Sequence, residues 1–316
     1  MEKIIVAQRP SLSQNYYFST ERYVSFQKNQ SMSRKNWTDD KLLLRLINNK
    51  SERTRWENIS VLRKRPSEAL FLKCVELTKS EDPKKRKIGI DILAQFGLPP
   101  RPFLNQSIKV FFDLLQTETD PKVLMALLYA ISHNNSDLNQ SQIQELCRFS
   151  NNDNEYIKEG LVAALLGIDD PQAIKTLIQL SSDRLSHIRD WATFGIGTQI
   201  DRNNKKIREA LWNRVNDRHQ DTKLEAILGL AKRKDSRVKD IIIRELIDGE
   251  FGSILFEAII ELEDKELLPH LETVLESSKN NNDINVEWIE ELKLCIQDLK
   301  ELPDKRKTTH NTKPNS

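Results

Sequence analysis

The sequence has little cysteine, glycine and proline, and it has no long apolar run. The three cysteines, Cys74, Cys147 and Cys295, lie far apart and form no CxxC motif, which argues against a disulfide framework or a zinc site and fits a reducing cytoplasm. Only 9 glycines and 11 prolines in 316 residues argue against an all-β fold, because such folds need many turns. No stretch of about 18 apolar residues occurs, so we expect a soluble, cytoplasmic protein without a membrane span.

Neither sign of charge dominates the chain. The 49 lysines and arginines against 47 acidic residues leave a net charge of +2, which excludes a uniformly basic nucleic-acid binder but not a local basic face. Segments 51–87 and 201–244 carry surpluses of +5 and +6, whereas segment 245–301 carries −12. This acidic stretch is either a solvated cap or a surface that recruits a basic partner; both interpretations stay open.

A motif recurs every 31 to 34 residues. A cation stands at the same point of three similar stretches, at Lys158, Arg189 and Lys223, and Arg86 and Arg55 continue the series upstream. We call these five residues the repeat cations. An apolar residue follows each of them by seven positions, at Leu62, Leu93, Leu165, Ile196 and Leu230. A small residue follows Lys158, Arg189 and Lys223 by six positions, at Ala164, Gly195 and Gly229. These spacings mark one face of a helix that a neighbouring helix approaches closely.

The segments between these stretches have their own apolar stripes and begin with helix-start signals. Asp82-Pro83, Asp120-Pro121 and Asp170-Pro171 each place a side-chain acceptor before a proline at the first helical position. About eight helix pairs fit between residues 37 and 302, at roughly 33 residues each, which is a normal repeat length for a helical-hairpin solenoid.

The segments 166–178, 183–197 and 267–271 carry a resemblance to a known family. They resemble bacterial HEAT-repeat proteins, in the broad group that includes the phycobilin-lyase-like HEAT repeats of the ARM-type fold. In such repeats an Asp in the turn precedes the cation of the second helix by six residues, and Asp183 with Arg189 matches that spacing. The resemblance implies an all-α, right-handed α-solenoid of about eight HEAT-like helical hairpins, whose second helices line the concave side.

Both ends of the chain depart from the repeat pattern. Residues 1–36 contain aromatic groups among Ser, Gln and Asn without a helical period. We expect a poorly ordered extension there, although an aromatic arm that docks on the first repeat or on a partner, and a natural start at Met32, stay open. Residues 37–302 form the solenoid, and residues 303–316 read as a disordered polar tail.

Catalytic motifs are absent from the sequence. It contains no GxxxxGK[ST], HExxH or GxSxG, and its five histidines, at positions 133, 187, 219, 270 and 310, show no ligand spacing. We therefore expect no catalytic residue, no metal site and no cofactor. Cys74 lies between Phe71 and Val75 on an apolar helix, which indicates a buried structural thiol.

The repeat cations have two interpretations. They form a ladder with the turn aspartates that ties each repeat to the next, or they form a basic stripe on the concave face. Trp191 and Trp56 stand beside Arg189 and Arg55, and a tryptophan next to a cation can stack on a peptide side chain or a nucleobase. Packing between helices is the alternative for both tryptophans. The candidate partner-binding residues are Trp191, Arg189, Asp190, Trp56, Arg86, Lys158 and Lys223.

An extended concave surface favours a non-enzymatic protein–protein interaction scaffold or adaptor. The first alternative is a nucleic-acid-binding protein similar to the alkylpurine DNA glycosylases built from HEAT-like repeats. A stretch with a net charge of −5, from residue 88 to 200, separates the two basic segments and weakens this alternative. The second alternative, a bilin lyase or chaperone-like HEAT protein, depends on repeat similarity alone.

Overall fold

The computed structural model describes residues 34–248, 251–278 and 285–303. In these ranges the chain forms sixteen α-helices and two short 3-10 helices, and no β-strand. The chain divides into two compact units, Met1–Arg202 and Asn203–Ser316, called here the first and the second unit. The expected extension, apart from its last three residues, and the expected tail, apart from Pro303, lie outside the described residues.

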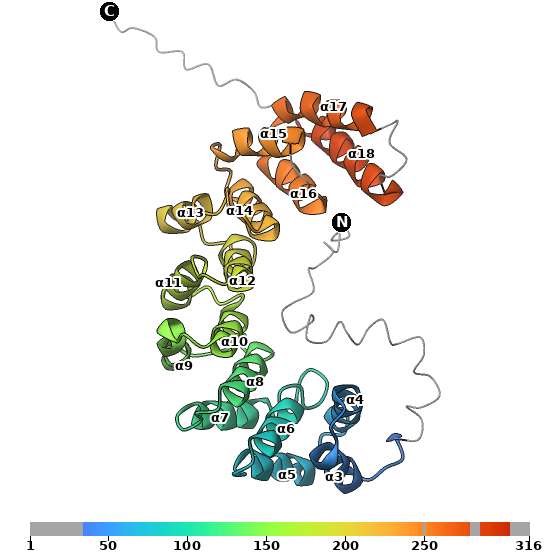
Figure 1. Ribbon diagram of the computed structural model, residues 1–316, viewed down its shortest axis with the longest axis vertical. Coiled ribbons are helices and arrows are strands. Elements are labelled where there is room, and N and C mark those ends of the chain that lie inside the picture. Colours follow the sequence, from blue (N-terminus) through green and yellow to red (C-terminus); the bar gives the residue numbers. More distant parts are fainter. Residues whose placement is uncertain (1–33, 249–250, 279–284, 304–316) are drawn as a thin grey trace, which may run out of the picture. The chain divides into compact units, whose positions relative to one another are not determined.

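The first unit is a stack of five antiparallel helical hairpins. They are α3 (Asp39–Asn48) with α4 (Glu52–Arg63), α5 (Glu68–Thr78) with α6 (Pro83–Leu93), α7 (Leu104–Leu115) with α8 (Pro121–Ser132), α9 (Gln140–Cys147) with α10 (Glu155–Leu165), and α11 (Pro171–Leu180) with α12 (Ser186–Gly197). A 3-10 helix, η2 (Arg148–Asn151), follows α9. The helices α8, α10 and α12 form one layer, and α7, α9 and α11 form the other (Figure 1).

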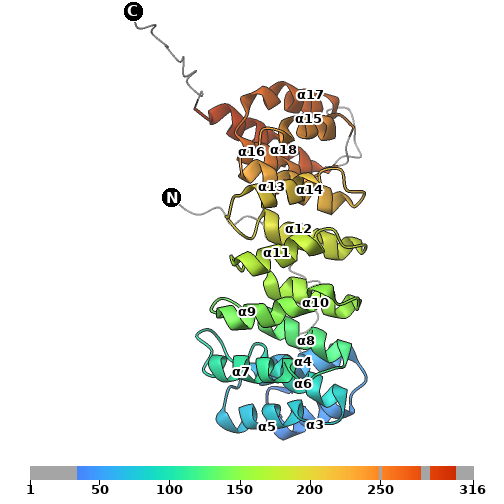
Figure 2. The same ribbon diagram turned by 90° about the vertical axis from the view of Figure 1, so that its left-hand side faces the viewer.

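The second unit contains three further hairpins. They are α13 (Lys205–Trp212) with α14 (Gln220–Lys232), α15 (Val238–Asp248) with α16 (Ser253–Leu262), and α17 (Leu268–Ser278) with α18 (Val286–Glu301). The short helix η3 (Lys265–Leu267) precedes α17. Within this unit α16 lies beside α18, and α15 lies beside α17 (Figure 2). The two units together give the eight helix pairs that the repeat length predicts.

The predicted helix starts are confirmed by their caps. The side chain of Asp120 accepts hydrogen bonds from the backbone N–H groups of Lys122 and Val123, at 2.9 and 3.1 Å. Asp82 and Asp170 cap α6 and α11 in the same way, each before a proline at the first helical position. These caps satisfy backbone donors that have no partner inside the helix.

The predicted core face is also confirmed. The apolar residues seven positions after the repeat cations are buried, each at most 1% exposed: Leu62, Leu93, Leu165, Ile196 and Leu230. Cys74, Cys147 and Cys295 are unpaired and buried, and burial raises the pKa of the Cys74 thiol to about 12. Cys74 is therefore the structural thiol that the sequence predicts.

Glycines set the closest contacts between helices of the first unit. A Cβ atom on Gly89 would lie 2.6 Å from the carbonyl oxygen of Cys74 on the neighbouring helix α5. On Gly160 it would lie 2.8 Å from the Cβ atom of Leu128, so α10 approaches α8 closely. At Gly195, the position that the repeat pattern predicts to be close, it would meet the flexible end of Leu166 at 3.0 Å. The tightest approaches are therefore at Gly89 and Gly160.

Candidate functional site

Two repeat cations of the first unit pair with a carboxylate in the turn of the next hairpin. The Lys158 Nζ atom on α10 lies 2.5 Å from Oδ2 of Asp183, in the turn before α12. The Arg86 Nε atom on α6 lies 2.6 Å from Oε2 of Glu118, in the turn before α8. The ladder interpretation thus describes both positions, with a glutamate in place of the expected aspartate at Glu118.

The other repeat cations have different partners. Lys223 Nζ lies 2.5 Å from Oε2 of Glu245 on α15, not from a turn aspartate. Asp217, in the turn six residues before Lys223, instead pairs with Arg214 at 3.2 Å. Arg55 pairs with Asp91 on α6. Arg189 Nη1 donates to the backbone carbonyls of residues 183 and 184 in its own turn, at 3.0 and 3.2 Å.

The ion pairs of Asp183 and Glu118 change the pKa of these carboxyl groups. Burial raises the pKa of Asp183, but hydrogen bonds from the Leu185 N–H and the Lys158 ammonium outweigh it and leave the pKa below its usual value. Glu118 behaves in the same way: burial opposes ionisation, and the Arg86 guanidinium together with backbone N–H groups lowers the pKa. A charge-assisted hydrogen bond to the ionised form explains both shifts.

The predicted partner-binding residues do not form one exposed surface. Trp191 is 6% exposed, and its indole meets the Phe194 ring edge to face at 5.5 Å. Asp190 and Lys158 are also buried. Trp56 is half-buried between two guanidinium groups, those of Arg55 and Arg63, at 4.8 and 5.6 Å from its ring. Arg86, Arg189 and Lys223 are half-buried too. Their role in partner binding stays a prediction.

One helix face lies beside the repeat cations on helices α8, α10 and α12, and only part of it is exposed, since Met125, Ala163 and Asp190 on it are buried. It contains the residues two positions before, one after and five after the cation, which share a helix face; on α8, Leu124 stands in the cation's place. Three partly exposed aromatic residues belong to it: Tyr129 on α8, Tyr156 on α10 and Phe194 on α12. We call these three residues the aromatic stripe. Tyr129 and Phe194 stand five positions after the cation site and Tyr156 stands two positions before it, so the three share a helix face but not one repeat position.

Contacts between neighbouring hairpins orient the aromatic stripe. The Tyr129 hydroxyl donates a hydrogen bond to Oε1 of Glu159 on α10, at 2.7 Å. The Lys122 ammonium lies 5.8 Å from the centre of the Tyr156 ring, which is 42% exposed. Each aromatic group is therefore held by a polar or aromatic neighbour while part of its surface stays accessible.

A polar network connects α4, α6 and α8 in the first unit. Arg63 donates to the Asp91 carbonyl and to the Gln95 side chain, at 2.9 and 2.7 Å. The Gln95 amide lies 3.1 Å from Nδ1 of His133, and Arg101 donates to the His133 carbonyl at 2.9 Å. Burial and the nearby cations Arg63 and Arg101 lower the pKa of His133 to about 3, so its imidazole is neutral near pH 7.

Two open grooves lie between hairpins. One, of about 370 Å³, lies between α7 and α9 and is lined by Leu104, Ile108, Phe112 and Leu138 among polar side chains. The other, of about 180 Å³, lies between α16 and α18. Among the residues that the structure describes, neither groove is lined by a histidine, and burial raises the pKa of the Cys295 thiol in the second groove to about 12.

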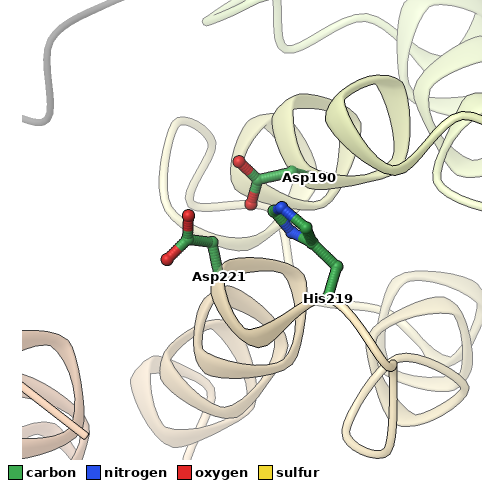
Figure 3. Close-up of side chains that lie close together, drawn as sticks. All are labelled: Asp190, His219 and Asp221. Atoms are coloured by element: carbon green, nitrogen blue, oxygen red, sulfur yellow. The ribbon is translucent and has the colours of Figure 1, made fainter.

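Figure 3 draws Asp190, from α12 of the first unit, with His219 and Asp221, from the start of α14 in the second unit. The His219 side chain caps α14: it accepts from the N–H of Thr222, and its Nδ1 lies 3.1 Å from the Thr222 hydroxyl. Because the imidazole serves as a helix cap and Asp190 belongs to the other unit, we assign no metal site to these residues.

Stacked helical hairpins with buried ion pairs between them define a HEAT-like helical-repeat protein, and the comparisons with known proteins agree. The chain is 33% identical over 154 residues to protein YibA of Escherichia coli K-12, and equally to YibA of Escherichia coli O157:H7. The matched region is 49% of this chain and 52% of YibA, so the chain spans about half the length of the curated relatives it matches.

A solved structure supports the same fold. The X-ray structure of Escherichia coli YibA, a HEAT-repeat-like protein, matches with a TM-score of 0.67 at 22% identity, over 86% of this chain and 96% of that chain. The predicted fold class, an all-α solenoid of helical hairpins, is thereby confirmed. No family model matches the chain, so the phycobilin-lyase-like group stays an expectation. Among the described residues, none of the helices is long and apolar enough to cross a bilayer.

Proposed function

We propose that this protein is a non-enzymatic protein-interaction scaffold, and that its first unit binds a protein partner through the aromatic stripe. The observation that carries this proposal is the recurrence of partly exposed aromatic side chains on three successive hairpins, at Tyr129, Tyr156 and Phe194. Tyrosines and other aromatic residues supply much of the binding energy at protein interfaces. A repeat scaffold presents such residues on successive helices along one face.

Trp191 and its neighbours have a supporting role in this proposal. The edge-to-face contact of Trp191 with Phe194 fixes the orientation of the exposed ring. Arg189 and Asp190 directly precede Trp191, and Arg189 donates hydrogen bonds to two backbone carbonyls of the turn before α12. We therefore expect Trp191→Ala to weaken partner binding by displacing Phe194, and not by removing a direct contact.

The pairing of the basic residues favours a protein partner over nucleic acid. Arg86, Lys158 and Lys223 are each within 2.6 Å of a carboxylate oxygen. A phosphate group would have to compete with these carboxylates, whereas salt-sensitive phosphate binding depends on cations that are available for it.

Three unpaired, buried cysteines also agree with a reducing, cytoplasmic location.

Affinity capture with the full chain tests the proposal. Wild type, Tyr156→Ala and Phe194→Ala are used to recover partners from nuclease-treated native lysate. The control is Leu72→Ala, which removes a 58% exposed apolar side chain from α5, outside the stripe. We expect each stripe variant to recover about tenfold less of one defined protein, at an unchanged melting temperature, and the control to recover it fully.

Three results would contradict this function. If both stripe variants recover the same partners as wild type, the aromatic stripe is not the interface. If the captured protein disappears after nuclease treatment, nucleic acid bridges the two proteins. Salt-resistant, nanomolar binding of DNA by the purified protein would replace the scaffold function altogether.

A further inference from the structure

One face of α18 carries five exposed side chains at helical spacing, and four of them are acidic. They are Glu287, Glu291, Leu294, Asp298 and Glu301. We call them the acidic stripe. The opposite face is buried against the second unit through Leu292, Cys295, Ile296 and Leu299. The helix is thus amphipathic, with a single leucine in the middle of its acidic side.

The lysines of α18 do not neutralise this stripe. Lys293 Nζ lies 2.8 Å from Oε1 of Glu290, and Lys300 Nζ lies 2.6 Å from Oε1 of Glu272 on α17. Neither glutamate belongs to the stripe. Within the described ranges, Glu291 and Asp298 have no ion-pair partner, so their negative charge is available to a ligand.

An apolar groove runs along the middle of the acidic stripe. It has a volume of about 180 Å³ and lies between α16 and α18, which are adjacent in Figure 2. Phe256 and Cys295 form its buried floor, and Ile260 is half-buried. Leu294 forms one wall and is 57% exposed. An exposed leucine beside an unfilled apolar groove is the kind of surface that association covers.

The acidic groups stand on both sides of this groove. Glu291 and Asp298 lie one turn before and one turn after Leu294 on α18, and all three line the groove. On the opposite wall, Glu257 of α16 is 3.3 Å from Lys232 of α14. The carboxylates of Glu291 and Asp298 are seven residues apart, about 10 Å along the helix axis. That separation is too large for them to share one metal ion, so a ligand with distributed positive charge fits better.

We propose that the groove between α16 and α18 binds a basic amphipathic helix of another protein. The partner inserts an apolar side chain beside Leu294, over Phe256 and Ile260, and places lysine or arginine side chains near Glu291 and Asp298. Helices bind apolar grooves through side chains spaced three, four or seven residues apart, and the charges select a basic partner and reject nucleic acid. This surface is separate from the aromatic stripe of the first unit, and the proposal does not depend on it.

A synthetic peptide of known composition tests the proposal with the full-length protein. The probe is a fluorescein-labelled amphipathic helix of about 18 residues made of leucine and lysine. One control peptide has glutamate in place of lysine, and another has alanine in place of leucine. Fluorescence anisotropy should show binding of the leucine–lysine peptide, about tenfold weaker binding of the alanine–lysine peptide, and no binding of the leucine–glutamate peptide.

Matched variants locate the binding site on α18. Leu294→Ala and Asp298→Asn should each weaken binding of the leucine–lysine peptide by about five- to tenfold. Asp298→Glu, which keeps the charge, should retain it. The controls Val286→Ala and Glu290→Gln remove an apolar side chain and a charge from the same helix outside the groove, and they should change affinity less than about twofold. The four substituted residues are all exposed, so the folded state should be unaffected.

The proposal is wrong if the leucine–lysine and leucine–glutamate peptides bind equally, or if the control variants lose as much affinity as Leu294→Ala and Asp298→Asn. A concentration-dependent dimer that Leu294→Ala abolishes in light scattering would also overturn it, because a second copy of the chain would then occupy the groove. None of these results bears on capture of a partner by Tyr156 and Phe194, so the two proposals fail separately.

Discussion

The two units of the chain hold the same repeat cation in different ways. In the first unit Lys158 reaches Asp183 in the turn of the next hairpin. In the second unit Lys223 reaches Glu245 on the first helix of the next hairpin, and the turn residue Asp217 is held by Arg214 instead. The repeat period therefore fixes the position of the cation in the helix, while the neighbouring side chains determine which carboxylate pairs with it.

The exposed faces of the units differ as much as their ion pairs. The first unit presents aromatic side chains on α8, α10 and α12, each supported by a neighbouring residue. The second unit presents an acidic helix face with one exposed leucine. A single helical-hairpin architecture thus carries two surfaces with different chemical preferences, as expected of repeat proteins, in which surface residues vary without changing the packing.

The largest effect is expected from breaking the buried pair of the first unit. Lys158→Met leaves the Asp183 carboxylate, 8% exposed, without its ammonium partner, and such a loss costs about 3–5 kcal/mol. Lys223→Met likewise leaves the Glu245 carboxylate, 7% exposed, without its partner, but the Lys223 side chain is 17% exposed against 9% for Lys158, so this loss should lie at the lower end of that range. Urea unfolding measures both changes, with the exposed Lys175→Met on α11 as the control. Equal losses for Lys158→Met and Lys223→Met would show that the two pairs are equivalent.

The next effect concerns the glycine contacts of the first unit. Gly89→Ala should destabilise the protein by about 2 kcal/mol, because the new methyl group meets the Cys74 carbonyl, part of the backbone. Gly195→Ala should be nearly neutral, since flexible leucine ends can yield and the higher helix propensity of alanine offsets the contact. The larger Gly195→Leu change should still cost about 2–4 kcal/mol at this buried position. Thermal melts rank the three variants; a Gly89→Ala protein as stable as wild type would contradict the close approach of α5 and α6.

Mild acid should weaken the first unit before the second. Between its unfolded pKa near 6.5 and its folded pKa of about 3, His133 binds a proton only in the unfolded chain. Stability therefore falls as the pH drops below 6.5, by about 1.4 kcal/mol at pH 5.5. His133→Gln should remove this loss between pH 7 and 5.5. Hydrogen exchange of α6 and α8 as a function of pH measures this loss of stability. A wild-type protein whose exchange does not depend on pH in this range would refute the prediction.

The second unit should respond only to stronger acid. Hydrogen bonds from Arg237 and Arg208 lower the pKa of Asp235 to about 2, although burial opposes this. A lowered carboxyl pKa stabilises the fold above the unfolded value near 4, and the stabilisation is lost as the pH falls toward 2. About 1 kcal/mol should be lost by pH 3 in wild type. Hydrogen exchange of α13 and α15 should show no such loss of stability in Asp235→Asn. A loss of the same size in the variant would mean that another carboxyl group causes it.

The sequence determined the local architecture because the relevant forces act within one or two helical turns. Asp-Pro pairs located the starts of α6, α8 and α11, since an N-cap needs only a side chain two or three residues from the backbone that it binds. The position seven residues after each repeat cation identified the core, because helical periodicity alone puts it on the buried face. The eight hairpins followed from the repeat length.

Only the tertiary structure decided the surfaces and the ion pairs. Whether Trp191 faces a partner or packs against Phe194 depends on which side of α12 the neighbouring helices cover, and a residue close to a half-buried cation can itself be fully buried. The partners Glu118, Asp183 and Glu245 lie 22 to 32 residues from their cations, so small differences in turn geometry change which carboxylate is in reach. The groove beside Leu294 exists because α16 and α18 pack at a distance that their own sequences do not specify.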